Sequence, residues 1–226
     1  MTVPADRCRR PEDRGRNHKI ATFVAPPSSD GTRATRANPA RTRLGSDGVT
    51  DRSEFLDQIK SKGVVHGAVT LSSGQQADWY VDLRRVLLYG TAARLAGRVM
   101  LDLTSGLSFT AVGGLTLGAD PVALAMMHAA TEQGRQLNAF IVRKEGKAHG
   151  LQRRIEGPDV TGQKVLAVED TSTTGNSVLT AVDVLAAAGA DVVGVAVIVD
   201  RGARGLVEER GLPYLAAYDL DDLGLS

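Results

Sequence analysis

The sequence has one cysteine, Cys8, in 226 residues, which excludes an intrachain disulfide framework and a metal site built from cysteines. It also lacks an apolar run near the ~18 residues that a membrane-spanning helix needs, and its N-terminus lacks the apolar core of a secretory signal. The net charge is only +1, so the overall balance gives no reason to expect a nucleic-acid or membrane partner. These absences favour a protein of the reducing cytoplasm.

The positive charge that is present gathers at the start of the chain. Residues 1–48 carry about five more basic than acidic residues, and the stretch 26–31, Pro-Pro-Ser-Ser-Asp-Gly, interrupts any helix or strand. Such a segment buries too little apolar surface to offset the entropy lost on ordering. We expect 1–48 to be a disordered basic tail and 49–226 to be one domain. The alternatives are an organelle transit peptide and a nucleic-acid-binding arm, but Asp6, Glu12 and Asp13 favour a dispensable tail.

Strands and helices alternate from about residue 49 onward. Apolar runs of strand length are separated by helical segments of ten or more residues, with Gly, Ser, Asp and Pro at the turns. This alternation predicts an α/β domain with a mostly parallel sheet flanked by helices, whose ligands bind beyond the C-terminal strand ends. The expected strands are 109–112, 139–142, 164–168, 192–199 and 214–217, with a small hairpin at 69–71 and 79–81. Helices are expected to begin near residues 51, 90, 120 and 176.

The most informative segment follows the predicted strand 164–168 and reads Glu169-Asp170-Thr171-Ser172-Thr173-Thr174-Gly175-Asn176-Ser177. Small hydroxyl residues and a glycine allow a tight turn whose N–H groups converge, and the helix that follows adds the positive end of its dipole. This is a cradle for a phosphate, and the two acids suit a ligand that also presents hydroxyl groups or a magnesium ion. The alternative is a plain turn and helix cap with solvated acids. The segment lacks the lysine of a P-loop and the three-glycine spacing of a dinucleotide fold.

This segment resembles the signature with which type I phosphoribosyltransferases bind 5-phosphoribosyl-1-diphosphate (PRPP). The features that carry the resemblance are the apolar strand, the paired acids, the hydroxyl-rich turn and the glycine. The resemblance implies that Glu169 and Asp170 hydrogen-bond the 2- and 3-hydroxyls of the ribose. It also implies Mg²⁺, held mainly by pyrophosphate and ribose oxygens, with no protein ligand assigned. The residues implied to hold the 5-phosphate are Thr171, Ser172, Thr173, Thr174, Gly175, Asn176 and Ser177.

Three further stretches resemble the orotate phosphoribosyltransferases, and the resemblance covers about residues 51–226. The run 143–150, Arg-Lys-Glu-Gly-Lys-Ala-His-Gly, is similar to that family's mobile catalytic loop, Arg-Lys-x-x-Lys-x-His-Gly. The run 199–201, Val-Asp-Arg, matches the strand end that brings an arginine to the orotate carboxylate. Residues 70–81 look like the small N-terminal hood over the base.

This resemblance implies a set of functional residues and a homodimer whose loop residues reach into the partner's site. Cations in the loop suit two anionic substrates, and an ordered loop would exclude water from the ribosyl centre. The implied catalytic residues are Lys144, Lys147 and His149. The implied PRPP contacts include these three and Arg143. The implied orotate contacts are Thr173, Arg201, Tyr80 and Val81.

Each stretch also has a purely structural alternative. Residues 143–159 would then be a solvated loop, Asp200 and Arg201 a surface ion pair, and the glycines of 113–118 a close-packing turn rather than the family's pyrophosphate loop. Trp79 is expected to pack in the hood or core. The alternative functions are a purine phosphoribosyltransferase, which would lack the loop of 143–150, and a non-catalytic PRPP-binding regulator, which would gain from a folded nucleic-acid-binding module.

The sequence departs from the orotate family's pattern at three places. Ser72 stands where many members have a lysine on the pyrophosphate side, and Arg84 or Arg85 is the candidate to replace it. Ala148 replaces an aspartate of the loop. Residues 152–154 read Gln-Arg-Arg in place of the usual glycines, which predicts a stiffer and more basic loop.

Overall fold

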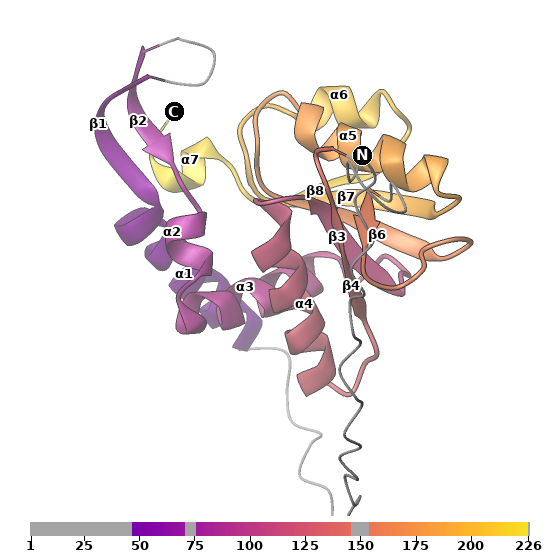
Figure 1. The fold of residues 1–226 in the computed structure, drawn as a ribbon. Helices are drawn as coiled ribbons and strands as arrows, with labels where there is room; N and C mark the ends of the chain where they lie inside the picture. The colour runs from indigo at the N-terminus through magenta and orange to yellow at the C-terminus, as the bar shows by residue number, and fades with distance from the viewer. Residues whose placement is uncertain (1–46, 71–75, 146–153, 226) are drawn as a thin grey trace, which may run out of the picture. The chain divides into compact units, whose positions relative to one another are not determined.

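The computed structural model describes residues 47–70, 76–145 and 154–225, which Figure 1 draws in colour. The predicted tail, residues 1–48, lies almost wholly outside the described residues and stays a prediction. The first helix, α1 (Asp47–Gln58), begins a turn earlier than the sequence indicated. Among the described residues, no helix is both long and apolar enough to span a bilayer.

Six strands form the main sheet in the order β5-β4-β3-β6-β7-β8. Five run parallel, and the short edge strand β5 pairs antiparallel with β4. The predicted α/β class with a mostly parallel sheet is therefore confirmed, although β5 was not predicted because two residues show no period. The strands are β3 (Ala111–Leu115), β4 (Asn138–Val142), β5 (Ile155–Glu156), β6 (Lys164–Ser172), β7 (Asp191–Asp200) and β8 (Tyr214–Tyr218).

The strands alternate their side chains between two apolar layers, as the period of two in a strand requires. On β6, Leu166 and Val168 pack in the layer formed with α1, α3 (Gly90–Leu103) and α4 (Ala119–Glu132). Val165 and Ala167 pack in the opposite layer with α5 (Asn176–Ala187) and α6 (Arg204–Glu208). Figure 1 shows these helix groups on the two sides of the sheet. Burying one such leucine contributes about 1.5–3 kcal/mol, so both layers hold the end of β6 firmly.

A separate two-stranded antiparallel sheet, formed by β1 (Val64–Thr70) and β2 (Gln76–Val81), precedes the main sheet. The predicted hairpin is confirmed, and β1 is longer than expected. It is flanked by the π-helical turn η1 (Ile59–Gly63) and by α2 (Arg84–Leu87). Ile59, Val81 and Val86 anchor it because they are buried in the same core as α3. In Figure 1 the two strands rise from these helices, and the short α7 (Leu220–Leu223) ends the chain.

Two strands of the main sheet run further than the sequence indicated. β6 continues through the acids to Ser172, because it keeps its pairing with β7 as far as Asp200. β3 includes Gly113 and Gly114, which were expected in a turn. A Cβ added to either glycine would lie 2.1 Å from a carbonyl oxygen of the neighbouring strand, β4 for Gly113 and β6 for Gly114. These two glycines therefore allow neighbouring strands to pack closely, whereas the structural alternative expected close packing of a strand and a helix. The role of this loop in binding pyrophosphate stays a prediction.

Candidate active site

The paired acids lie at the C-terminal end of β6, between β3 and β7. Glu169 is only 5% exposed, and Asp170 is half-buried. The turn after β3 packs directly on them, because a Cβ added to Gly118 would lie 2.3 Å from Glu169 Oε1 and 2.6 Å from Asp170 Oδ1. A side chain at position 118 would therefore displace the carboxylate ends of Glu169 and Asp170. The structure thus brings together the two glycine-containing segments that the sequence had singled out.

A third carboxylate, that of Asp120 at the start of α4, acts on the same pair. The Thr116 hydroxyl donates to Asp120 Oδ2 at 2.7 Å, while the buried Oδ1 has no hydrogen-bond partner among the described residues. Burial raises the pKa of Glu169 to about 9, and the charges of Asp170 and Asp120 act in the same direction. Burial also raises the pKa of Asp170, against the charge of Arg84. Such crowded, desolvated acids suit a ligand that brings hydroxyl donors or a cation.

The turn after the acids leads into the N-terminus of α5. Gly175 occupies the cap position with φ +73°, a conformation that glycine adopts without strain, and no described side chain caps the helix. Gly175 at the cap agrees with the turn and helix cap of the structural alternative, but its solvated acids are contradicted because Glu169 is buried. The N–H groups of the first turn remain for an outside acceptor such as a phosphate. Thr171 and Ser172 lie in β6, and the exposed residues at the turn are Thr173, Thr174, Asn176 and Ser177.

Arg201 follows β7 and lies beside the same turn, because its backbone N–H donates to the Ser172 carbonyl at 2.8 Å. The neighbouring carboxylate is engaged elsewhere: Asp200 Oδ1 accepts from two backbone N–H groups of the following turn and from the Tyr214 hydroxyl, each at 3.0 Å. Within the described part of the chain no ion pair joins Asp200 to Arg201, and Arg201 Nε is buried without a partner. The surface ion pair considered as an alternative is therefore wrong.

The guanidinium of Arg201 lies over the ring of Trp79 in β2, 5.3 Å from the ring centroid. This contact ties the small sheet to the end of β7. Sequence reasoning expected Trp79 only to pack in the hood or core, and no local pattern could have revealed a partner so distant in the chain. Asp120 was missed in the same way, because Asp120-Pro121 was taken only as the start of a helix.

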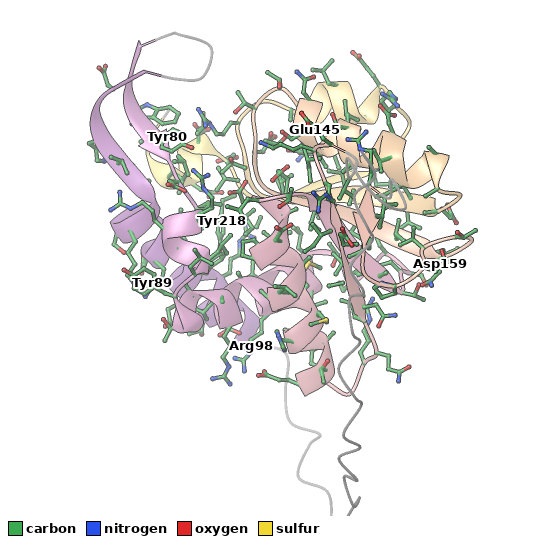
Figure 2. The ribbon with its side chains drawn as sticks, viewed as in Figure 1. Tyr80, Tyr89, Arg98, Glu145, Asp159 and Tyr218 are labelled. Carbon is green, nitrogen blue, oxygen red and sulfur yellow. The ribbon has the colours of Figure 1, made fainter. Side chains whose placement is uncertain are left out.

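The predicted base contacts on β2 differ in how they are placed. Figure 2 shows Tyr80 on this strand, where it is half-buried. Val81 is 2% exposed and belongs to the core, so only its backbone is free to contact a base. Arg84 donates to Asp82 Oδ1 at 2.9 Å, and its charge also acts on Asp170. Arg84 is thus brought towards the acids, while Ser72 lies outside the described residues.

Of the predicted catalytic loop, the structure describes the two ends. The backbone N–H of Arg143 donates to the Arg154 carbonyl at 2.7 Å. In return the Arg154 guanidinium donates to the carbonyl oxygens of Arg143 at 3.2 Å and Lys144 at 2.8 Å. The two ends are therefore tied together through main-chain groups. Lys144 is exposed, whereas Lys147 and His149 lie outside the described residues, so their roles stay predictions.

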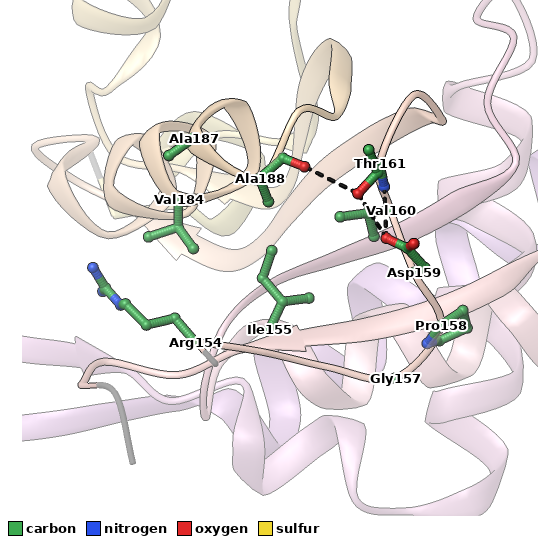
Figure 3. Close-up of a pocket in the computed structure, with 10 residues that line it drawn as sticks. All are labelled: Arg154, Ile155, Gly157, Pro158, Asp159, Val160, Thr161, Val184, Ala187 and Ala188. Atoms are coloured by element: carbon green, nitrogen blue, oxygen red, sulfur yellow. Dashed lines mark hydrogen bonds between the residues drawn. The ribbon is translucent and has the colours of Figure 1, made fainter. Parts of the chain in front are cut away.

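A cavity of about 640 Å³ opens between the 157–161 turn and the C-terminal part of α5, as Figure 3 shows. At its wall the Thr161 hydroxyl donates to Asp159 at 2.8 Å and to the Ala188 carbonyl at 3.3 Å. None of the predicted site residues that the structure describes lines it, so this cavity is separate from the acids and the phosphate turn. Its lining residues are Arg154, Ile155, Gly157, Pro158, Asp159, Val160, Thr161, Val184, Ala187 and Ala188.

The donor set at the acids is incomplete for a metal ion held by protein alone. Among the described residues, no group of three His, Cys, Asp or Glu side chains is placed to hold one. A hard cation at Glu169 and Asp170 would need further oxygens from a ligand or from water, as Mg²⁺ commonly takes them.

Comparisons with known proteins agree with this arrangement. Residues 113–212 match the phosphoribosyl transferase domain family. The orotate phosphoribosyltransferase of Streptomyces avermitilis is 64% identical over 177 residues, covering 77% of this chain and 97% of that protein. That of Corynebacterium glutamicum strain R is 58% identical over 180 residues, covering 79% and 96%.

Solved structures give the same result. The orotate phosphoribosyltransferase of Mycobacterium tuberculosis, in complex with Fe(III) dicitrate, is 56% identical with a TM-score of 0.71, covering 77% of this chain and 99% of that one. The same enzyme in complex with PRPP is 51% identical with a TM-score of 0.68, at the same coverage. The acids, the turn, the fold and these relatives all lead to one conclusion: the chain belongs to the orotate phosphoribosyltransferase family.

Proposed function

We propose that the protein transfers the phosphoribosyl group of PRPP to orotate, giving orotidine 5′-monophosphate and pyrophosphate in pyrimidine biosynthesis. The bond between the anomeric carbon and the pyrophosphate oxygen breaks, and a bond to a ring nitrogen of orotate forms as that nitrogen loses its proton. The observation that carries the proposal is the buried pair Glu169 and Asp170, followed by a helix N-terminus that no described side chain caps. The curated relatives at 57–64% identity support it.

The geometry at β6 and α5 supports a placement of PRPP. The 5-phosphate would accept hydrogen bonds from the N–H groups of the turn and the first residues of α5, from Thr171 to Ser177. The 2- and 3-hydroxyls of the ribose would donate to Glu169 and Asp170, whose high pKa values are lowered when donors arrive. The pyrophosphate would then extend over the turn after β3 that ends at Gly118, which packs on these acids.

The base would lie between the end of β7 and β2. Orotate carries a carboxylate, and the guanidinium of Arg201 is a planar fork of donors that matches it. Thr173 lies on the turn beside Arg201, and Tyr80 and the backbone of Val81 would cover the base from the hairpin. This arrangement favours orotate over adenine or hypoxanthine, since neither purine has a carboxylate for Arg201.

Charge neutralisation would come from the loop and from Mg²⁺. Arg143, Lys144, Lys147 and His149 would gather around the departing pyrophosphate, where preorganised cations stabilise developing negative charge. The residues present fit a cation at Glu169 and Asp170, because the acids there are crowded and an Asp120 oxygen lacks a partner. Bound Mg²⁺ would supply positive charge that offsets that of the pyrophosphate. Its remaining ligands would be oxygens of PRPP and water.

Two further parts of the proposal concern assembly and location. We propose a homodimer in which Lys144, Lys147 and His149 reach the partner's site, on the strength of the family resemblance. We also propose that the protein acts in the cytoplasm. Light scattering tests whether the protein is a dimer. A second experiment mixes two inactive variants, one altered in the loop and one at the acids. Activity should return in the mixed dimer if the loop of one subunit completes the site of the other.

Parallel steady-state assays test the reaction. The purified protein is incubated with PRPP and Mg²⁺ and with orotate, adenine or hypoxanthine, and pyrophosphate release is measured. Only orotate is expected to be consumed. Turnover of a purine would instead establish a purine phosphoribosyltransferase. PRPP binding by calorimetry without turnover of any base would establish a regulator.

The loop is tested by Lys147→Ala. Its kcat should collapse while its melting temperature stays within about 2 °C of wild type, because a loop lysine buries little apolar surface. Unchanged turnover would remove Lys147 from the catalytic set.

A further inference from the structure

We infer that Trp79 is a positioning residue that holds the Arg201 guanidinium ready for a carboxylate, and that this pair sets the preference for a carboxylated pyrimidine. The inference rests on the proposed function, because it assigns the base carboxylate to Arg201. It adds a residue on another sheet that no pattern in the sequence singles out.

The backbone places Arg201 before any ligand binds. Ser172 pairs with Asp200 across β6 and β7, and the Arg201 N–H donates to the Ser172 carbonyl at 2.8 Å. Its Cα is therefore fixed at the end of β7, beside the end of β6, which carries the acids. The backbone leaves the long side chain free to rotate, so something else must select one direction for the guanidinium.

The neighbouring carboxylate, Asp200, does not orient the guanidinium of Arg201. Asp200 Oδ1 holds two backbone N–H groups and the Tyr214 hydroxyl, and burial, together with the Asp200 charge, raises the pKa of that tyrosine. Asp200 therefore shapes the turn after β7. It leaves the positive charge of Arg201 available to an anion from outside.

Trp79 supplies the missing constraint. Its backbone pairs with His66 in the small sheet and its side chain packs against the core, which restrains the ring. The Arg201 guanidinium lies over this ring at 5.3 Å. A cation–π contact uses none of the N–H donors of the guanidinium, which point outward in its plane.

One of these donors identifies the class of ligand. Arg201 Nε is buried and has no hydrogen-bond partner among the described residues. A buried donor without a partner is costly, and a carboxylate accepts from Nε and a terminal nitrogen together as a bidentate pair. The geometry therefore suits a planar base with a carboxylate, and a base without one would leave the donor unsatisfied.

Kinetics of variants test the role of Trp79. Trp79→Leu should raise the KM for orotate about tenfold and leave the KM for PRPP within about twofold. Trp79→Phe keeps an aromatic face, so it should raise the KM for orotate much less. In an Arg201→Leu background, Trp79→Leu should add less than about twofold, because Trp79 acts through Arg201. Equal changes in both KM values, or fully additive effects, would overturn the inference.

A spectroscopic readout avoids any change to Trp79, which is the chain's single tryptophan. The fluorescence emission of Trp79 should change when orotate is added with pyrophosphate and Mg²⁺, and it should not change when uracil is added. Free tryptophan measured with the same ligands corrects for their absorbance. Arg201→Leu should shift the emission of the free protein and abolish the response. Emission identical in wild type and Arg201→Leu contradicts the stacked contact even if orotate is turned over. Wild-type protein that does not use orotate refutes the proposed function itself.

Discussion

Gly118, in the turn after β3, lies against Glu169 near the end of β6, far from it in the sequence: a Cβ added to Gly118 would lie 2.3 Å from Glu169 Oε1. The turn after β3 can therefore approach the acid pair only as bare backbone. This contact joins the segment proposed to hold pyrophosphate to the segment proposed to hold ribose, so a single ligand can span both.

Gly118→Ala should damage PRPP use more than stability. The added methyl group must displace the carboxylate ends of Glu169 and Asp170 or the turn itself, and overpacking of this kind costs about 1–3 kcal/mol. We expect kcat/KM for PRPP to fall at least tenfold, with a smaller change in the KM for orotate. Gly205→Ala is the matched control, because a Cβ there meets no atom within 4 Å. Wild-type kinetics for Gly118→Ala would show that the turn does not contact PRPP.

Ligand binding at the acids should release a proton. The pKa of Glu169 is raised from 4.5 to about 9, mainly by burial, so this carboxyl holds its proton at pH 8 in the empty site. Ribose hydroxyls and Mg²⁺ favour the ionised form, so affinity for PRPP should rise as the pH approaches 9. Calorimetry at pH 8, in two buffers of different ionisation enthalpy, measures the proton directly. Glu169→Gln should abolish the release, and identical heats in both buffers for wild type would contradict the assignment.

The same raised pKa fixes the sign of a stability effect. Between pH 4.5 and about 9 the folded state keeps the Glu169 proton and the unfolded state has lost it. The contribution of this group to the free energy of unfolding therefore falls as the pH rises through that window. In denaturant titrations from pH 6 to pH 8.5, the free energy of unfolding should fall less steeply with pH in Glu169→Gln than in wild type.

Arg154 should support catalysis through the loop ends. Its guanidinium donates to the carbonyl oxygens of Arg143 and Lys144, and its own carbonyl accepts from the Arg143 N–H. Arg154→Leu removes the side-chain bonds, so we expect kcat to fall about three- to tenfold while the KM for orotate stays near its wild-type value. Arg154→Lys should recover only part of the lost kcat, since an ammonium group lacks the planar set of N–H donors of a guanidinium.

The control for Arg154 is Arg210→Leu, which removes an exposed ion pair with Asp183 and the same charge. Its effect on stability should stay below about 1 kcal/mol, with kcat unchanged. If both variants lower kcat equally, the effect of Arg154 comes from its charge alone.

The sequence predicted those features of the fold and site that depend on the order of neighbouring segments along the chain. Alternating strands and helices gave the parallel sheet, and the placement of Glu169 and Arg201 after strands gave the edge where ligands bind. It did not reveal contacts between distant segments, since the stacking of Trp79 on Arg201 and the charge of Asp120 beside Glu169 arise only from packing. The end of β6 was also misplaced, because acids and threonines gave no apolar signal although β7 pairs with them.

The rigidity of the site should depend on the two apolar layers around β6. Leu166 is fully buried in the layer with α3 and α4, three residues before the first of the acids. Leu166→Ala removes methyl groups from a packed interior, so the free energy of unfolding should fall by about 2–5 kcal/mol. Leu206→Ala changes a side chain that is 48% exposed and should cost less than about 1 kcal/mol. Denaturant unfolding of both variants measures the difference. A loss for Leu166→Ala no larger than that for Leu206→Ala would mean that the core does not fix the strand that carries the acids.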